Sequence, residues 1–105
     1  MASSSTTALE SVRRLIKFLN INNIQISKAY VFGSYARKQH NEWSDIDLVL
    51  VSDKFEGIMF NDRCKVNPFV VKVDTRIEAH PFNPKDFTED NPFVKEVIRT
   101  GIQIV

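Results

Sequence analysis

The sequence has little of three features that would point to particular classes of protein. It contains one cysteine, which cannot form an internal disulfide and is typical of a reducing compartment. Its apolar stretches, such as those at residues 49–51 and 69–71, are far shorter than the roughly 20 residues of a membrane span. Its net charge is only +1, which gives no strong signal for a surface that binds DNA or RNA.

The start of the chain also lacks a recognisable targeting pattern. In MASSSTTALE no basic region precedes an apolar one, so we expect no signal peptide and a cytoplasmic location. With 105 residues, of which 43% are hydrophobic and 26% charged, the chain can build one core but not two. We therefore expect a disordered N-terminus at residues 1–7 and a single domain at residues 8–105.

Segments rich in aromatic and β-branched residues are predicted to be strands. They are residues 28–32, 46–51 and 69–77, with a last short strand at residues 102–105. Between the second and third strands, residues 53–67 show little periodicity, and we expect a loop there.

Helical periodicity begins near residue 8 and continues to about residue 19, with Thr6 or Thr7 as the expected N-cap. Three shorter helices are expected from turn and proline signals: residues 34–39, 84–87 and 92–99. The resulting order predicts an α/β (α+β) fold in which helices flank a small mixed or antiparallel sheet.

Two aspartates at the start of the second strand are the first candidates for chemistry. Asp45 and Asp47 are two residues apart, so on a strand both side chains project from one face, with Cα atoms about 7 Å apart. Two adjacent carboxylates repel each other unless one takes up a proton or a cation binds between them. Mg²⁺ prefers such oxygen ligands, and a pair of Mg²⁺ ions can support displacement at phosphorus. A capping box at Ser44 and Asp47 is the plainer alternative, but the apolar run after Asp47 favours a strand.

A glycine and a serine upstream of these aspartates predict a phosphate-binding bend. Gly33 ends the first strand, and a helix beginning near Ser34 would direct free backbone N–H groups toward an anion. Arg37, about one turn later, would add a guanidinium suited to phosphate oxygens, although an ordinary surface arginine is an equally good interpretation.

A third carboxylate would complete the predicted metal site. Asp74 and Glu78 lie on the same face if they belong to one strand. We prefer Glu78, because an antiparallel neighbour would bring the end of that strand beside Asp45, but Asp74 remains an alternative. His80 is expected to order the strand exit rather than to act as a base.

The pattern resembles the minimal nucleotidyltransferase domains of the DNA polymerase β superfamily. The motif consists of Gly33-Ser34, ten residues and then Asp45-x-Asp47, and residues 76–82 resemble the stretch that holds the third acid in that family. The resemblance extends from about residue 9 to the end of the chain. Lys38 is a departure, because the family often has glycine there.

The resemblance implies a nucleotidyltransferase fold and an enzyme that uses ATP with two Mg²⁺ ions. Ser34, with Gly33, would bind the triphosphate, and Arg37 would contact it. Asp45, Asp47 and Glu78 would bind the metal ions. Many such stand-alone domains are antitoxins that transfer AMP to a tyrosine of a HEPN ribonuclease toxin, so a HEPN toxin is the expected partner, in a homo- or hetero-oligomer. Two alternatives stay open: an aminoglycoside-type transfer to a small molecule, and a non-catalytic module that sequesters a toxin.

Overall fold

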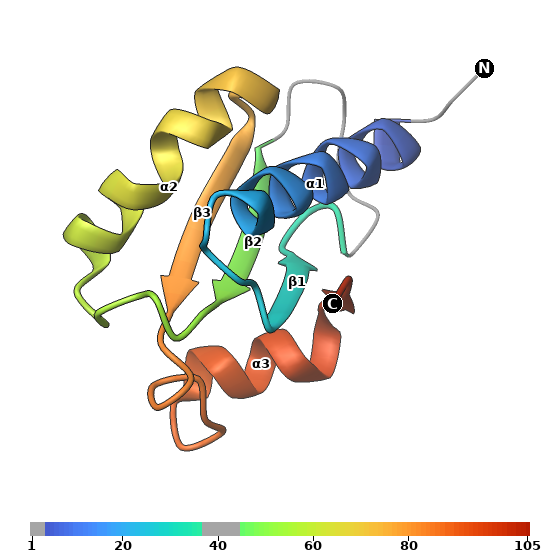
Figure 1. The fold of residues 1–105 in the computed structure, drawn as a ribbon. Coiled ribbons are helices and arrows are strands. Elements are labelled where there is room, and N and C mark those ends of the chain that lie inside the picture. Colours follow the sequence, from blue (N-terminus) through green and yellow to red (C-terminus); the bar gives the residue numbers. More distant parts are fainter. Residues whose placement is uncertain (1–3, 37–44) are drawn as a thin grey trace.

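The computed structural model describes residues 4–36 and 45–105 of the chain. Within these ranges, three helices and four strands follow one another along the chain (Figure 1). They are α1 (Ser4–Ile21), β1 (Lys28–Phe32), β2 (Ile46–Val51), α2 (Met59–Val73), β3 (Ile77–Phe82), α3 (Pro92–Thr100) and β4 (Ile102–Gln103). None of these described helices has both the length and the apolar character needed to cross a bilayer.

The strands form one mixed sheet in the order β3-β2-β1-β4. β1 runs antiparallel to both β2 and β4, whereas β2 and β3 are parallel. Parallel neighbours need a crossover connection, and α2 supplies it between β2 and β3. The predicted fold class, a small α+β domain with helices around a mixed sheet, is confirmed.

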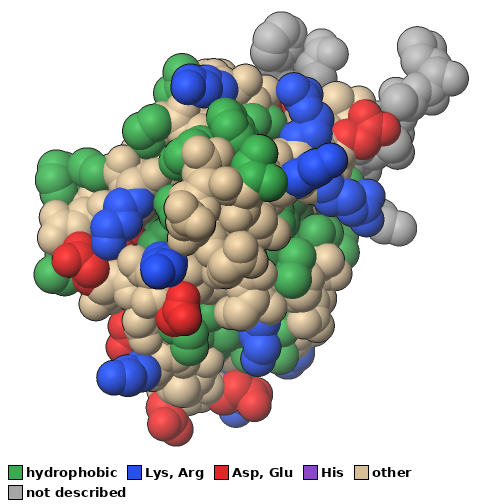
Figure 2. Space-filling view, in the orientation of Figure 1, with side chains coloured by type: hydrophobic (Ala, Val, Ile, Leu, Met, Phe, Trp, Pro, Cys, Tyr) green, Lys and Arg blue, Asp and Glu red, His purple; other side chains and the backbone are tan. Residues whose placement is uncertain are grey.

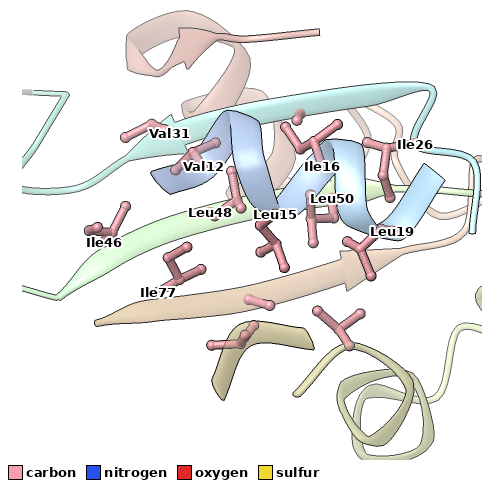
Figure 3. Packing of buried hydrophobic residues seen from close by; sticks show 14 of the residues in the cluster. Val12, Leu15, Ile16, Leu19, Ile26, Val31, Ile46, Leu48, Leu50 and Ile77 are labelled. Atoms are coloured by element: carbon pink, nitrogen blue, oxygen red, sulfur yellow. The ribbon is translucent and has the colours of Figure 1, made fainter. Parts of the chain in front are cut away.

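Each face of the sheet has its own apolar cluster. On one face α1 and α2 cover Ile46, Leu48 and Leu50 of β2 (Figure 3). On the other face α3 packs against Val49 and Val51 of the same strand. The alternation of side chains along β2 therefore divides its apolar residues between two cores. In Figure 2, which shows the side of α1 and α2, basic and acidic side chains are interspersed.

The third strand was wrongly placed from the sequence. Residues 59–73, expected as a loop and the start of a strand, form α2, and β3 begins only at Ile77. The β-branched run before Val73 imitates a strand, and Pro68 inside the segment argues against a helix. The helical signal is the burial of Val66 and Val70, four residues apart, while Val71 is 68% exposed.

Smaller differences concern the ends of helices. α1 begins at Ser4, so Thr6 and Thr7 lie inside it and do not occupy the N-cap position. Residues 84–86 form a turn where a helix was expected at residues 84–87, and the Asn83 carbonyl accepts backbone hydrogen bonds from Asp86 and Phe87. The first two strands have the predicted bounds, and the helix expected at residues 92–99 is extended by one residue.

Candidate active site

Asp47 lies at the centre of the candidate site, on the face of the sheet that α3 partly covers. In the sheet register Asp47 is opposite Phe32 of β1 and Glu78 of β3. Its neighbours along β2, Ile46 and Leu48, are fully buried on the opposite face. Asp47 is half-buried, so its carboxylate is at the edge of a packed surface and is still accessible.

The predicted phosphate-binding bend directly contacts Asp47. Gly33 has φ +73°, a conformation that glycine adopts without strain, and residues 33–36 form a turn. A Cβ at Gly33 would lie 2.5 Å from Asp47 Oδ2, so only glycine lets the backbone approach this carboxylate. Tyr35 is buried in the core beneath α1, and its hydroxyl accepts a hydrogen bond of 3.3 Å from Arg76. The motif loop is thus anchored through Tyr35 in the α1-side core, while Gly33 lies next to Asp47.

Three side chains from β2 and β3 converge in the site. Asp47, Glu78 and His80 each offer one possible ligand atom, and these atoms lie within 4.8 Å of one another. His80 Nε2 is 3.7 Å from Asp47 Oδ1, slightly beyond hydrogen-bond distance. This Nε2 atom is buried and has no hydrogen-bond partner among the described residues.

The carboxylates around Asp47 carry negative charge that nearby basic groups compensate only in part. Burial raises the pKa of the Asp47 carboxyl, and the charges of Glu78 and Asp45 raise it further, against an opposing effect of His80. Burial also lowers the pKa of the His80 imidazole, with Arg63 adding to the effect. An arrangement of this kind is stabilised by a cation placed between the groups.

Asp45 occupies a more open position than the sequence predicts. It is exposed, immediately before β2, and is not part of the group formed by Asp47, Glu78 and His80. Asp45 and Glu78 instead line a cleft of about 280 Å³ between β3 and α2. The other residues of the cleft are mainly polar: Arg63, Asn67, Thr75, Arg76, Ile77 and Ala79.

Arg63 of α2 fixes one side of this cleft. Its Nε donates a 3.0 Å hydrogen bond to the Ala79 carbonyl, and its Nη2 lies 3.6 Å from Glu78 Oε1. Both side chains are partly exposed, so the ion pair is weak. Arg63 was missed from the sequence because the segment that contains it had been assigned to a loop.

Asp74, the alternative third ligand, is engaged elsewhere. Its carboxylate accepts hydrogen bonds of 3.1 and 2.8 Å from Arg76, and these bonds lower the pKa of Asp74 to about 2. Glu78, in contrast, is directly opposite Asp47. The reason given for preferring Glu78 was nevertheless wrong, because β3 is parallel to β2 and Glu78 is the second residue of β3, not its last.

The donors that meet here fit a divalent ion. Two carboxylates and an imidazole nitrogen are common metal ligands, and the partnerless Nε2 of His80 has a lone pair or proton to satisfy. The roles predicted for Asp45, Asp47, Glu78, Gly33 and Ser34 stay predictions. Arg37, the predicted triphosphate contact, lies outside the described residues.

The structure thus combines a mixed sheet, carboxylates on two adjacent strands and a glycine bend in contact with one of these carboxylates. The family model for the nucleotidyltransferase domain matches residues 10–104, and the chain belongs to this family. Its fold is similar to a crystal structure from Sulfolobus solfataricus, of a protein whose own assignment as a nucleotidyltransferase is provisional. The TM-score is 0.67 at 16% identity, over 98% of this chain and 87% of the other. No curated protein matches the chain.

Proposed function

We propose that this domain is a divalent-metal-dependent adenylyltransferase that moves AMP from ATP to a hydroxyl of a protein, a tyrosine of a HEPN toxin, and so acts as an antitoxin. Membership of the nucleotidyltransferase family supports the general reaction. The geometry of the site supports the choice of donor, metal and acceptor.

One observation carries the proposal: the contact between the Gly33 bend and the Asp47 carboxylate. The space left by the absent Cβ is only 2.5 Å from Asp47 Oδ2, so a phosphate held at the bend would also be close to the acidic group. A nucleoside triphosphate with its bound cation needs both features within a few ångströms. Gly33 and Ser34 would hold the β- and γ-phosphates, and Asp47 with Glu78 would face the reacting end.

The reaction exchanges one bond to the α-phosphorus for another. The acceptor oxygen forms a bond to the α-phosphorus, the bond to the bridging oxygen of the β-phosphate breaks, and pyrophosphate leaves while the hydroxyl proton passes to solvent. Asp47 and Glu78 would hold a divalent ion, which when bound lowers the pKa of an attacking hydroxyl and neutralises a leaving phosphate. Tyr35 of the turn at residues 33–36 is buried in the core, so the turn is fixed in position and would hold the polyphosphate in the orientation needed for attack.

A protein acceptor is favoured by the exposure of the acidic side of the site. Asp45 is exposed and the Glu78 side chain is 48% exposed, so a bulky acceptor can approach them. At the start of α2, Phe60 is 75% exposed and Met59 43% exposed, a pair that a partner protein could cover. A small-molecule acceptor would gain more from an enclosed pocket than from this open cleft.

The direct test is transfer of label from [α-³²P]ATP to a co-expressed HEPN protein, with Mg²⁺ or Mn²⁺ present. We expect labelled toxin with the unaltered domain and none with Asp47→Asn or Glu78→Gln. As a matched control, Asp90→Asn removes an exposed carboxylate from the turn before α3 and should leave labelling unchanged. Toxin that is neutralised equally well by Asp47→Asn, without label, would refute the catalytic proposal in favour of sequestration.

A further inference from the structure

His80 is held rigidly beside Asp47 by aromatic side chains from two other elements. Its ring packs edge-on against Phe32 of β1, with centroids 5.0 Å apart, and lies 6.0 Å from the ring of Phe93 on α3. Phe32 and Phe93 also contact each other at 5.3 Å. The imidazole therefore cannot leave the site without disturbing this aromatic cluster.

In this orientation the Nε2 atom of His80 makes no hydrogen bond to the described residues. The atom itself is buried, while the side chain as a whole is 20% exposed. Buried nitrogens are rarely left in this state. Asp47 Oδ1 is 3.7 Å away from this Nε2 atom.

That separation suits two ligands of one metal ion better than a direct hydrogen bond. Ligand atoms that are each about 2.1 Å from a metal are about 3.0 to 3.4 Å apart at octahedral or tetrahedral angles. A shift of a few tenths of an ångström would bring His80 Nε2 and Asp47 Oδ1 into this range. Glu78, which offers a ligand atom within 4.8 Å of those of Asp47 and His80, supplies the third donor.

We propose that His80 Nε2 is a metal ligand together with Asp47 and Glu78, and that this nitrogen makes the site select a first-row transition ion, such as Mn²⁺, over Mg²⁺. The proposal rests on the proposed function for the existence of a metal site. Mg²⁺ binds mainly oxygen ligands, whereas imidazole favours transition ions and carboxylates accept both. A site with one nitrogen and two carboxylates therefore discriminates, and a site of three carboxylates does not.

Direct binding tests the proposal without any need for transfer activity. The free Mn²⁺ signal in electron paramagnetic resonance gives the Kd of the purified domain, and competition gives that for Mg²⁺. We expect Mn²⁺ to bind at least about tenfold more tightly than Mg²⁺. His80→Gln should weaken Mn²⁺ by about tenfold or more and Mg²⁺ by less than about threefold. His80→Asp, which restores an oxygen ligand, should bind both ions and lose the preference.

A spectroscopic signature separates ligation from a structural role. In the Mn²⁺-bound wild-type domain, electron spin echo modulation from a directly bound ¹⁴N should appear, and it should vanish when only the histidines carry ¹⁵N. This measurement needs no variant that could fail to fold. Phe82→Leu is the matched control, because it alters the same aromatic cluster two residues further along β3 without removing a donor. It should keep the nitrogen signal.

The possible failures are distinguishable. If Mn²⁺ binds in a manner that depends on Asp47 and Glu78 but shows no nitrogen modulation, or binds equally well to His80→Gln, this inference is wrong and the proposed function stands. If neither ion binds to the wild-type domain, with or without ATP, both proposals fail.

Discussion

The two faces of the sheet use the same strands for opposite purposes. Toward α1 and α2, β2 presents Ile46, Leu48 and Leu50, all fully buried in one continuous apolar cluster. Toward α3 the same strand presents Val49 and Val51, which are buried in the second apolar cluster. Asp47 projects from this face too, but it is only half-buried. Stability is thus concentrated on one face, and the other face ends in a polar site next to a smaller core.

Two aspartates show the same contrast at the level of single groups. Asp74, near α1, is satisfied by Arg76 and Ser11, and its pKa is lowered to about 2. Asp47, toward α3, has its pKa raised by burial and by neighbouring carboxylates. A carboxylate that the fold stabilises is structural, while one that the fold leaves under-compensated is available for a cation.

Asp47→Asn is expected to have the largest effect on activity. We expect AMP transfer to fall by about a thousandfold or more, because one ligand and its charge are lost. The free energy of unfolding should not fall, because the pKa of Asp47 is raised in the folded state. Such a carboxyl favours folding most at low pH and loses that contribution as pH rises through its folded pKa. The neutral amide avoids this loss at pH 7.

The measurement pairs labelled transfer with urea unfolding of the same preparation at pH 7. The free energy of unfolding should be unchanged or slightly higher than that of the wild type. A loss of more than about 2 kcal/mol would mean that Asp47 supports the fold after all.

Leu48→Ala, one residue further along β2, should have the opposite profile. Leu48 is fully buried between the sheet and the helices of the α1 side, so its truncation should cost about 2 to 5 kcal/mol in urea unfolding. Mn²⁺ affinity of the fraction that remains folded should stay within about threefold of the wild type. Val71→Ala, at a side chain that is 68% exposed, is the control and should change stability by no more than about 0.5 kcal/mol.

Gly33→Ala should lower both the stability of the fold and the affinity for Mn²⁺, and Gly57→Ala is a matched control for it. Gly33 and Gly57 both have positive φ, at 73° and 91°, and a Cβ at either would approach a carboxylate oxygen within 2.6 Å. Each substitution to alanine should therefore cost about 1 to 2 kcal/mol of stability. Only Gly33→Ala pushes on Asp47, and only it should weaken Mn²⁺ binding, by about tenfold; the Cβ at Gly57 meets the exposed Asp86 instead.

Calorimetry of Mn²⁺ binding beside thermal unfolding checks this pair of variants. Equal effects of both glycine substitutions on Mn²⁺ affinity would show that general loosening, and not contact with Asp47, links the bend to the site.

Local patterns in the sequence were enough to predict the strands β1 and β2 and the bend at Gly33, which position part of the candidate site. Strand periodicity gave the bounds of both strands, and the need for a glycine at a bend singled out Gly33. The side-chain alternation that separates Asp47 from Leu48 follows from the pleat alone.

The contribution of β3 could not be read in the same way, because it depends on pairing between distant segments. α2 has a weak amphipathic pattern with exposed Phe60 and Val71, and this concealed the crossover helix that a parallel strand requires. His80 was consequently taken for a residue at a strand exit. Once β3 is known to pair in parallel with β2, the alternation of Glu78 and His80 places both beside Asp47.

Asp74 and Asp47 should also differ in how their contributions to stability depend on pH. The pKa of Asp74 is lowered from 3.8 to about 2 by its hydrogen bonds to Arg76, so its contribution to stability is present above pH 4 and is lost as pH falls from about 4 to 2. Asp74→Asn should reduce the free energy of unfolding at pH 7 by about 1 to 2 kcal/mol, with some discount for partial exposure. Unfolding curves of variant and wild type should converge near pH 2.

Asp90→Asn, at an exposed position, serves as the control and should follow the wild type at every pH. The same Asp74 variant also tests which acid belongs to the site. Because its carboxylate is bound to Arg76 and lies outside the group of Asp47, Glu78 and His80, its removal should leave Mn²⁺ affinity within about threefold of the wild type. A loss comparable to that of Asp47→Asn would assign Asp74 to the metal, and the division between a structural and a functional face would fail with it.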